Sequence, residues 1–254
     1  MSEHIVIETL EDGIAGLRLA RAPVNALTPK LLFGIAEALD GLAAEDDVGA
    51  VVLTGTGRSL SAGMDLKELL GFDLADQTAM VDGLNTCYAT AYEFPKPLIT
   101  AANGHAIAGG LFFVLVGDYR VVSKRALLGL TEVRVGVSFP VVASALACHE
   151  LGANAARRIM LSGENVTAAE ALALGFVDEV VAPDDVAARA LAMARQYRAI
   201  PPQTYASVKA QVRGDVVAGY RKALTAGDPA LDGWFNDETL PAATALLAAA
   251  TGKG

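Results

Sequence analysis

Two short glycine-containing segments have the composition of a site that stabilises a negatively charged oxygen. The segments "SLSAGMDLKELL" (59–70) and "GHAIAGGLFF" (104–113) each run from a strand-like stretch into a helix-like stretch. A helix N-terminus carries unpaired N–H groups and about half a positive charge. Two such N-termini on adjacent strands could bind one oxygen that becomes negative during a reaction. The alternative is that both segments are tight turns with a structural role only.

A third candidate group is the carboxyl of Glu132, in "GLTEVRVG". Such a group can serve as a general base beside an oxyanion site, or it can be an ordinary solvated acid. Other chemistries have weaker support. The segment "GTGRSLS" lacks the Gly-Lys-Ser/Thr ending of a phosphate-binding loop, and no Gly-x-Ser-x-Gly elbow is present. The histidines and cysteines lack metal-ligand spacing, so we expect no metal site.

Composition narrows the class of protein. The chain has 254 residues, 53% hydrophobic and 19% charged, as in a globular protein. Its formal net charge of −9 and the lack of a Lys/Arg cluster argue against nucleic-acid binding. No apolar run reaches the roughly 18 residues of a membrane span, and the N-terminus has no signal pattern. With two cysteines that fit reduced thiols, these features predict a cytoplasmic protein.

The elements that must hold these groups alternate between strand and helix. The apolar runs predict a hairpin within residues 4–20, a helix after Thr28 and a longer helix over 74–93. Short, fully apolar strands such as "GAVVLTG" and "LITAAN" are typical of a parallel sheet covered on both faces. From Pro140 onward the pattern is almost entirely helical, apart from a short strand at "VDEVV", and ends in a helix near Glu238 to Ala250.

Five segments in order resemble the crotonase, or enoyl-CoA hydratase/isomerase, superfamily. They are "RAPVNAL", "SAGMDLKEL", "NGHAIAGG…GDYRVV", "GLTEVRVGV" and "LSGENVTAAEALALGFVDEVV". The resemblance covers nearly the whole chain. It implies an α/β fold, a spiral of repeated ββα units with a helical C-terminal trimerisation region. We therefore expect a core over 1–195 with the acyl-CoA site, a helical oligomerisation region over 196–254, and a homotrimer or hexamer.

The resemblance also assigns site residues. It implies that the backbone N–H groups of Met64 and Gly109 form an oxyanion hole for an acyl-CoA thioester, and that Glu132 is the catalytic base. The substrate itself carries the coenzyme A, so no separate cofactor is expected. Lys67 is expected to contact the CoA phosphates, although it could be an ordinary solvated lysine. The expected substrate-binding residues are Ala62, Gly63, Asp65, Leu66, Lys67, Gly110 and Phe112.

One departure from the family pattern bears on the reaction. Two-glutamate hydratases carry a Glu three residues after the oxyanion glycine, where this chain has Phe112. Hydration needs a water polarised by carboxylates, whereas moving a double bond needs only one base that removes and returns a proton. The motifs are also similar to those of Δ3,Δ2-enoyl-CoA isomerases of fatty acid metabolism, with Thr131 in place of an Asn. We therefore interpret the chain as a Δ3-to-Δ2 enoyl-CoA isomerase. A single-glutamate hydratase and a non-catalytic acyl-CoA-binding homologue are the alternatives, and the acyl chain stays undefined.

Overall fold

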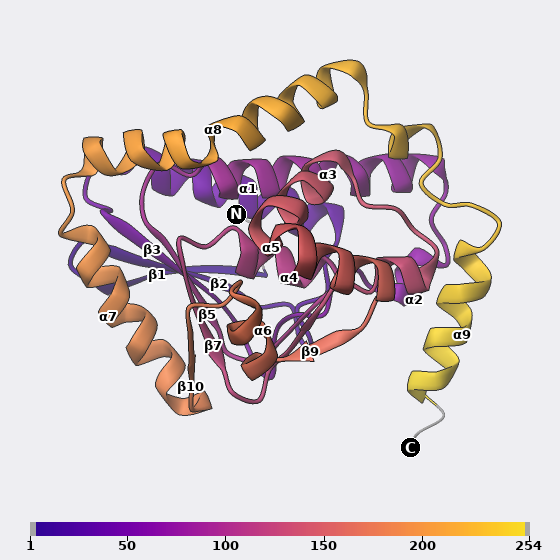
Figure 1. The fold of residues 1–254 in the computed structure, drawn as a ribbon, viewed down its shortest axis with the longest axis horizontal. Coiled ribbons are helices and arrows are strands. Elements are labelled where there is room, and N and C mark those ends of the chain that lie inside the picture. The colour runs from indigo at the N-terminus through magenta and orange to yellow at the C-terminus, as the bar shows by residue number, and fades with distance from the viewer. Residues whose placement is uncertain (1–3, 252–254) are drawn as a thin grey trace.

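The computed structural model describes residues 4–251 of the chain as an α/β fold of two sheets and surrounding helices (Figure 1). The strands are β1 (Ile5–Glu11), β2 (Ile14–Leu19), β3 (Ala50–Gly55), β4 (Ser59–Ser61), β5 (Leu98–Ala102), β6 (His105–Ile107), β7 (Tyr119–Ser123), β8 (Leu127–Gly129), β9 (Asn165–Thr167) and β10 (Glu179–Val181). The α-helices are α1 (Pro29–Ala44), α2 (Leu66–Leu69), α3 (Leu74–Glu93), α4 (Gly109–Leu115), α5 (Val141–Ser162), α6 (Ala168–Leu174), α7 (Val186–Arg198), α8 (Pro202–Ala226) and α9 (Thr239–Thr251). Three short 3₁₀ turns are η1 (Glu132–Val135), η2 (Pro183–Asp185) and η3 (Pro229–Asp232).

The larger sheet has six strands in the order β1-β2-β3-β5-β7-β10. The predicted hairpin of β1 and β2 is confirmed as its antiparallel edge, and β3, β5, β7 and β10 then add in parallel. The strand β5 is buried along its whole length, because α7 packs on one face of the sheet and the rest of the core on the other. This two-sided burial explains why the apolar runs of these strands do not alternate.

The smaller sheet has four strands, in the order β4-β6-β8-β9, and it shows how the ββα units repeat. In each of the pairs β3-β4, β5-β6 and β7-β8, the first strand joins the larger sheet and the second joins the smaller one. A helix follows each pair before the next repeat begins. Each repeat therefore advances the chain by one strand in both sheets. The spiral of ββα units expected from the sequence is confirmed.

Helices α1 and α3 pack against each other on the side of the larger sheet opposite α7. The side chain of Thr28 accepts a hydrogen bond from the Leu31 N–H, so the predicted N-cap is confirmed. The Leu and Ile side chains of α1 are buried, and each contributes roughly 1.5–3 kcal/mol through its burial, whereas Phe33 of the same helix is exposed. The helix predicted over 74–93 is α3, and it begins with a capping box between Asp73 and Asp76.

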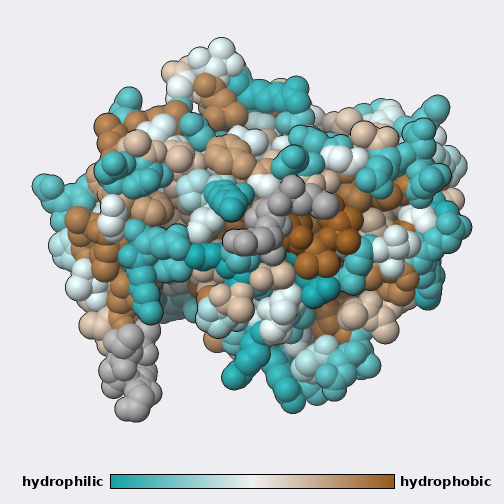
Figure 2. Space-filling view, turned by 180° about the vertical axis from the view of Figure 1, so that it is seen from behind, coloured by the Kyte–Doolittle hydropathy of each residue, from teal (hydrophilic) through white to brown (hydrophobic). Residues whose placement is uncertain are grey.

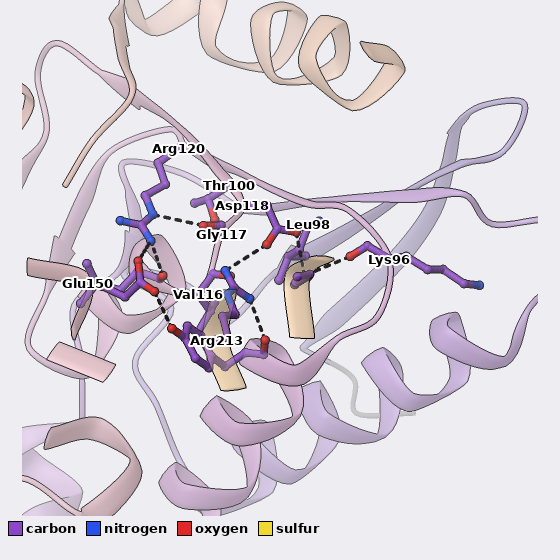
Figure 3. Close-up of polar contacts among 12 residues, drawn as sticks. Lys96, Leu98, Thr100, Val116, Gly117, Asp118, Arg120, Glu150 and Arg213 are labelled. Carbon is purple, nitrogen blue, oxygen red and sulfur yellow. Dashed lines mark hydrogen bonds and ion pairs between the residues drawn. The ribbon is translucent and has the colours of Figure 1, made fainter. Parts of the chain in front are cut away.

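A buried ion-pair cluster attaches α8 to the core (Figure 3). The carboxylate of Asp118 pairs with Lys209 Nζ at 2.7 Å and with Arg213 Nη2 at 2.9 Å. Beside it, Arg120 pairs with Glu150 of α5. Asp118 and Arg120 are close in sequence, but each pairs with a residue from a distant segment and not with the other. Helix α8 lies about ninety residues further along the chain and brings both cations to Asp118, a long-range contact that local spacing cannot show.

The stretch after Pro140 is less purely helical than expected. Strand β9 pairs antiparallel with β8 in the smaller sheet, although the sequence indicated only helix there. Three residues are too few to show a strand period. The predicted strand at "VDEVV" is confirmed as β10. The division of the chain after residue 195 stays a prediction, and that residue lies inside α7.

Several large apolar side chains lie on the surface. Leu161 is 73% exposed, Val212 67% and Leu74 60%. Figure 2 shows apolar patches between hydrophilic side chains on the face turned away from the viewer in Figure 1. The homotrimer or hexamer stays a prediction, and exposed apolar surface of this kind could be buried between its subunits. Within residues 4–251, no helix is both long enough and apolar enough to cross a membrane.

Candidate active site

A cavity of about 510 Å³ brings most of the predicted site residues together. It lies between the loop before α2, the N-terminus of α4, the η1 turn and the C-terminal segment. Six of the ten predicted site residues line it: Ala62, Met64, Leu66, Gly109, Phe112 and Glu132. These residues come from three separate ββα units, so the spiral is what assembles the site.

The carboxyl of Glu132 is buried at the start of η1, and the residue is only 6% exposed. Its Oε2 atom has no hydrogen-bond partner among the described residues. Burial raises the pKa of Glu132 to about 8, and a bond from its own backbone N–H offsets only part of that effect. An unpaired carboxyl that borders a cavity and titrates near neutral pH is suited to accept and return a proton.

The two N–H groups expected to bind an oxyanion belong to neighbouring parts of the backbone. A Cβ atom placed on Gly63 would lie 3.2 Å from the Gly109 nitrogen and 2.8 Å from the Ala108 Cβ. Gly63 has a φ of +81°, which glycine adopts without strain. Ala108 also has a positive φ, of 49°, and such a conformation costs a non-glycine residue about 1–3 kcal/mol. The residue with the strained backbone, Ala108, therefore directly precedes the Gly109 N–H.

Hydrogen bonds fix the orientation of both peptide units. The Gly63 carbonyl accepts from the Leu27 N–H at 2.8 Å, and the Ala108 carbonyl accepts from the Leu111 N–H at 2.9 Å. In a trans peptide the C=O and N–H point in opposite directions, so these bonds also fix the N–H of Met64 and of Gly109. Neither of those two N–H groups donates a hydrogen bond within residues 4–251. Both remain available to an acceptor in the cavity.

A buried polar cluster supports the loop that carries Met64. The Ser61 hydroxyl donates to the Asn25 carbonyl at 2.7 Å and accepts from the Gly63 N–H at 3.2 Å. The Asn25 side-chain amide donates to the backbone carbonyls of Thr56, in the turn before β4, and of Ser59 and Leu60, in β4. The motif "PVNAL" carried the resemblance, but the sequence did not show that its Asn holds the oxyanion loop in place.

An aromatic wall surrounds Phe112, the residue that the family resemblance places at the position of a hydratase glutamate. Phe112 is 1% exposed, and its ring stacks on Tyr88 with centroids 4.7 Å apart and meets Phe139 edge-on at 6.4 Å. The Tyr88 hydroxyl donates to the Gly109 carbonyl at 2.7 Å. A Cβ on Gly109 would lie 2.9 Å from both the Tyr88 oxygen and a Leu27 methyl group, so a larger residue there would have to displace one or both side chains.

The remaining four predicted residues flank the cavity and do not line it: Gly63, Asp65, Lys67 and Gly110. Asp65 caps α2 by accepting from the Lys67 N–H at 3.0 Å, and it pairs with Arg21 at 3.5 Å. The Lys67 side chain is exposed outside the cavity. A Cβ on Gly110 would come within 2.2 Å of the Ser61 carbonyl oxygen, so this glycine allows α4 to approach β4 closely.

Several cavity residues were not predicted from the sequence. Trp234 and Leu246 reach the cavity from the C-terminal segment. Arg134 and Glu164 also line it and form an ion pair, with Arg134 Nη2 and Glu164 Oε1 3.7 Å apart. The Glu164 side chain is 69% exposed, in contrast to buried Glu132. Of these residues, only Arg134 has a sequence signal, because it lies two residues after the predicted base Glu132.

Several known proteins are similar to this chain in sequence and in fold. The "Probable enoyl-CoA hydratase EchA17" of Mycobacterium tuberculosis is 36% identical over 202 residues, which cover 79% of this chain and 77% of that protein. The human mitochondrial Δ3-Δ2-enoyl-CoA isomerase is 27% identical with a TM-score of 0.90, over 99% of this chain and 100% of that one. The probable enoyl-CoA hydratase EchA3 of Mycobacterium tuberculosis is 30% identical with a TM-score of 0.81, over 98% of each chain. Residues 9–237 match the family described as "Enoyl-CoA hydratase/isomerase", and the chain therefore belongs to that family.

Proposed function

We propose that this member of the enoyl-CoA hydratase/isomerase family is a Δ3-to-Δ2 enoyl-CoA isomerase. One observation carries the proposal. The cavity holds one buried, unpaired carboxyl, that of Glu132, and the position of the second hydratase carboxylate is occupied by Phe112 within an aromatic wall. The match to an isomerase over 99% of this chain supports the same reaction class.

In the proposed reaction, the thioester carbonyl oxygen accepts hydrogen bonds from the N–H groups of Met64 and Gly109. The thioester and the adjacent double bond acidify the α-proton, and Glu132 removes it. The negative charge of the resulting dienolate develops on the oxygen held by the two N–H groups. Losing one such donor typically costs about 2.7–4 kcal/mol of transition-state stabilisation. Glu132 then returns the proton to the γ-carbon, which gives the conjugated 2-enoyl thioester.

The elevated pKa of Glu132 suits both proton transfers. A carboxylate with a pKa of about 8 is a stronger base than an ordinary glutamate, and its acid form still releases the proton to a carbanion. The reaction moves one proton and no electrons, so it needs neither a redox cofactor nor a metal. The coenzyme A moiety enters as part of the substrate. The side chain of Lys67, exposed beside the cavity, is proposed to contact its phosphates.

Hydration is the second candidate, and two observations favour it. The similar EchA17 and EchA3 proteins are described as probable hydratases, and Glu164 supplies a second carboxylate at the cavity. However, Glu164 is exposed and paired with Arg134, which weakens its ability to polarise a water. A non-catalytic acyl-CoA-binding homologue is the third candidate. Its pocket would bind thioesters without turnover.

One assay separates the three candidates. Purified protein is supplied with 3-enoyl-CoA and, separately, with 2-enoyl-CoA, and the conjugated and the hydrated thioesters are both quantified. An isomerase forms 2-enoyl-CoA from the first substrate much faster than it hydrates the second. Faster hydration of 2-enoyl-CoA would replace the proposal by the hydratase. Binding without turnover of either thioester would indicate the non-catalytic homologue.

A further inference from the structure

The C-terminal segment is hydrogen-bonded to the loop that follows Glu132. The Thr239 hydroxyl donates to the Gly136 carbonyl at 2.8 Å, and the Asn236 side-chain amide donates to the same oxygen at 3.3 Å. Thr239 is fully buried, and its hydroxyl also accepts from the Asn236 N–H at 3.0 Å. A bridge between Val137 and Phe235 continues the contact. Two segments about 100 residues apart are therefore joined at one carbonyl.

That carbonyl belongs to the residue that ends the η1 turn. Gly136 is in the left-handed conformation, with a φ of 70°, and its N–H bonds to the Glu132 carbonyl. The Val137 N–H donates to the same carbonyl at 3.2 Å. At the other end of the turn, the Thr131 side chain makes no capping bond. A turn of four residues has few bonds of its own, so contacts from other segments, including those at its C-terminal end, hold it in place.

The same segment borders the cavity that Glu132 lines. Trp234 and Leu246 line the cavity that Glu132 lines, and α9 contacts η1 directly. In Figure 1, α9 lies beside α2 at one end of the molecule, and the two helices are in contact. The Trp234 indole N–H donates to the Ser138 carbonyl at 2.7 Å, which closes the connection between the segment and the loop.

We propose that Thr239 is a positioning residue for Glu132. By holding the Gly136 carbonyl, its hydroxyl fixes the end of η1 and seats the start of α9 against it, so that the Glu132 carboxyl stays buried and directed at the substrate. The catalytic part of this inference rests on the proposed function. The C-terminal segment of the chain thereby becomes part of the proton-transfer machinery and does more than enclose the cavity.

The first test compares three variants. Thr239→Val keeps the shape and removes the hydroxyl, Thr239→Ser keeps the hydroxyl, and Thr244→Val removes a hydroxyl that bonds only within α9, to the Leu240 carbonyl. A displacement of about 1 Å at a catalytic group can cost 100-fold, so we expect Thr239→Val to lower kcat by about 10- to 100-fold with little change in KM. The pH at which kcat/KM rises should be lower for Thr239→Val than for the wild type. Thr239→Ser should restore most of kcat, and Thr244→Val should match the wild type.

A second variant covers the case in which Thr239→Val does not fold. Asn236→Asp keeps the oxygen that caps the Glu238 N–H at 2.8 Å and removes the donor to Gly136, at an exposed position. It should show the same shift of the pH profile at smaller size. Thermal unfolding establishes that each variant is folded. If folded Thr239→Val and Asn236→Asp keep the wild-type kcat and pH profile, Thr239 has no positioning role.

A readout independent of turnover separates this inference from the proposed function. The effect of Glu132→Gln on stability is measured between pH 5.5 and 8.5 in the wild-type background and in the Thr239→Val background. A looser C-terminal segment admits water to Glu132, so the change with pH should be smaller in the second background. An equal change in both backgrounds overturns the inference. If the wild type turns over neither thioester, the proposed function fails while this comparison still decides the role of Thr239.

Discussion

The substitution Glu132→Gln tests whether the folded protein holds this carboxyl in its protonated form. Burial raises the pKa of Glu132 from 4.5 to about 8. Between these two values the folded protein binds a proton that the unfolded chain has lost. Stability falls with rising pH wherever the folded state binds more protons. The wild type should therefore lose stability steadily as the pH rises from about 4.5 to about 8, and the variant, which has no proton to lose at this position, should not.

The size of the effect follows from the pKa difference. Each pKa unit corresponds to about 1.4 kcal/mol, so the full penalty for ionised, buried Glu132 is on the order of 5 kcal/mol above pH 8. Over the accessible range from pH 5.5 to pH 8.5, the linkage relation gives about 3 kcal/mol. The amide of the variant is also buried, and its desolvation costs free energy as well. That cost does not depend on pH, so the change with pH isolates the carboxyl.

The assay is urea unfolding of wild type and variant at fixed protein concentration, in steps of half a pH unit. A matched control is Glu164→Gln, which removes a carboxyl that borders the same cavity but is 69% exposed. The difference in unfolding free energy between Glu132→Gln and wild type should grow by about 3 kcal/mol across the range, while the control difference stays flat. A constant difference for Glu132→Gln would refute the argument, because it would mean that Glu132 ionises in the folded protein as it does in the unfolded chain.

The remaining predictions concern activity. The kcat/KM of the wild type should rise with pH to a plateau above about 8, because the base must be ionised, and a flat profile would contradict this. Glu132→Gln should lose at least about 100-fold in kcat, and a residual rate above about a tenth of the wild-type rate would contradict the role of Glu132 as the base. Gly109→Ala places a methyl group 2.9 Å from Leu27 and Tyr88, so it should lower kcat by about 10²–10³-fold, and an unchanged kcat would exclude the Gly109 N–H as an oxyanion donor. Phe112→Glu should reduce thermal stability and raise the ratio of hydration to isomerisation, measured from both substrates, and an unchanged ratio in folded protein would oppose the isomerase assignment. Lys67→Ala should raise KM for CoA esters more than for pantetheine thioesters, whereas equal changes would place Lys67 away from the CoA phosphates.

Much of the fold could be predicted because local patterns agree with it. The apolar period of α1 with the Thr28 cap and the uninterrupted apolar run of β5 each indicate a single local structure, and glycines mark the starts of α2 and α4. The ordered motifs then connected these elements into the ββα spiral. Strand β9 was missed because its three residues are held by pairing with β8 and have no periodicity of their own.

Residues that support the site were harder to predict, because their roles depend on distant contacts. Tyr88 is an ordinary buried aromatic residue in the α3 pattern, and its hydrogen bond to Gly109 appears only when α3 and α4 are packed together. The positive φ of Ala108 has no signal in its residue type. Thr239 lies at the start of α9, where a Thr is expected to cap a helix, and its bond to Gly136 spans 103 residues. The sequence placed six of the ten candidate residues at one cavity and missed the contacts that hold them.

The two carboxyls at the cavity show why burial, and not residue type, determines which one can serve as the base. Glu164 faces solvent beside Arg134, so water and the guanidinium both stabilise its charge. Glu132 lacks both forms of stabilisation at Oε2, so its ionised form is high in free energy and gains most by accepting a proton. Apolar residues that line the same cavity, among them buried Phe112 and Trp234, contribute to the apolar surroundings of Glu132 and so strengthen the base without contacting the proton. Under the proposed function, the same apolar lining offers few partners to the water that hydration would consume, so the feature that makes Glu132 basic would also favour isomerisation over hydration.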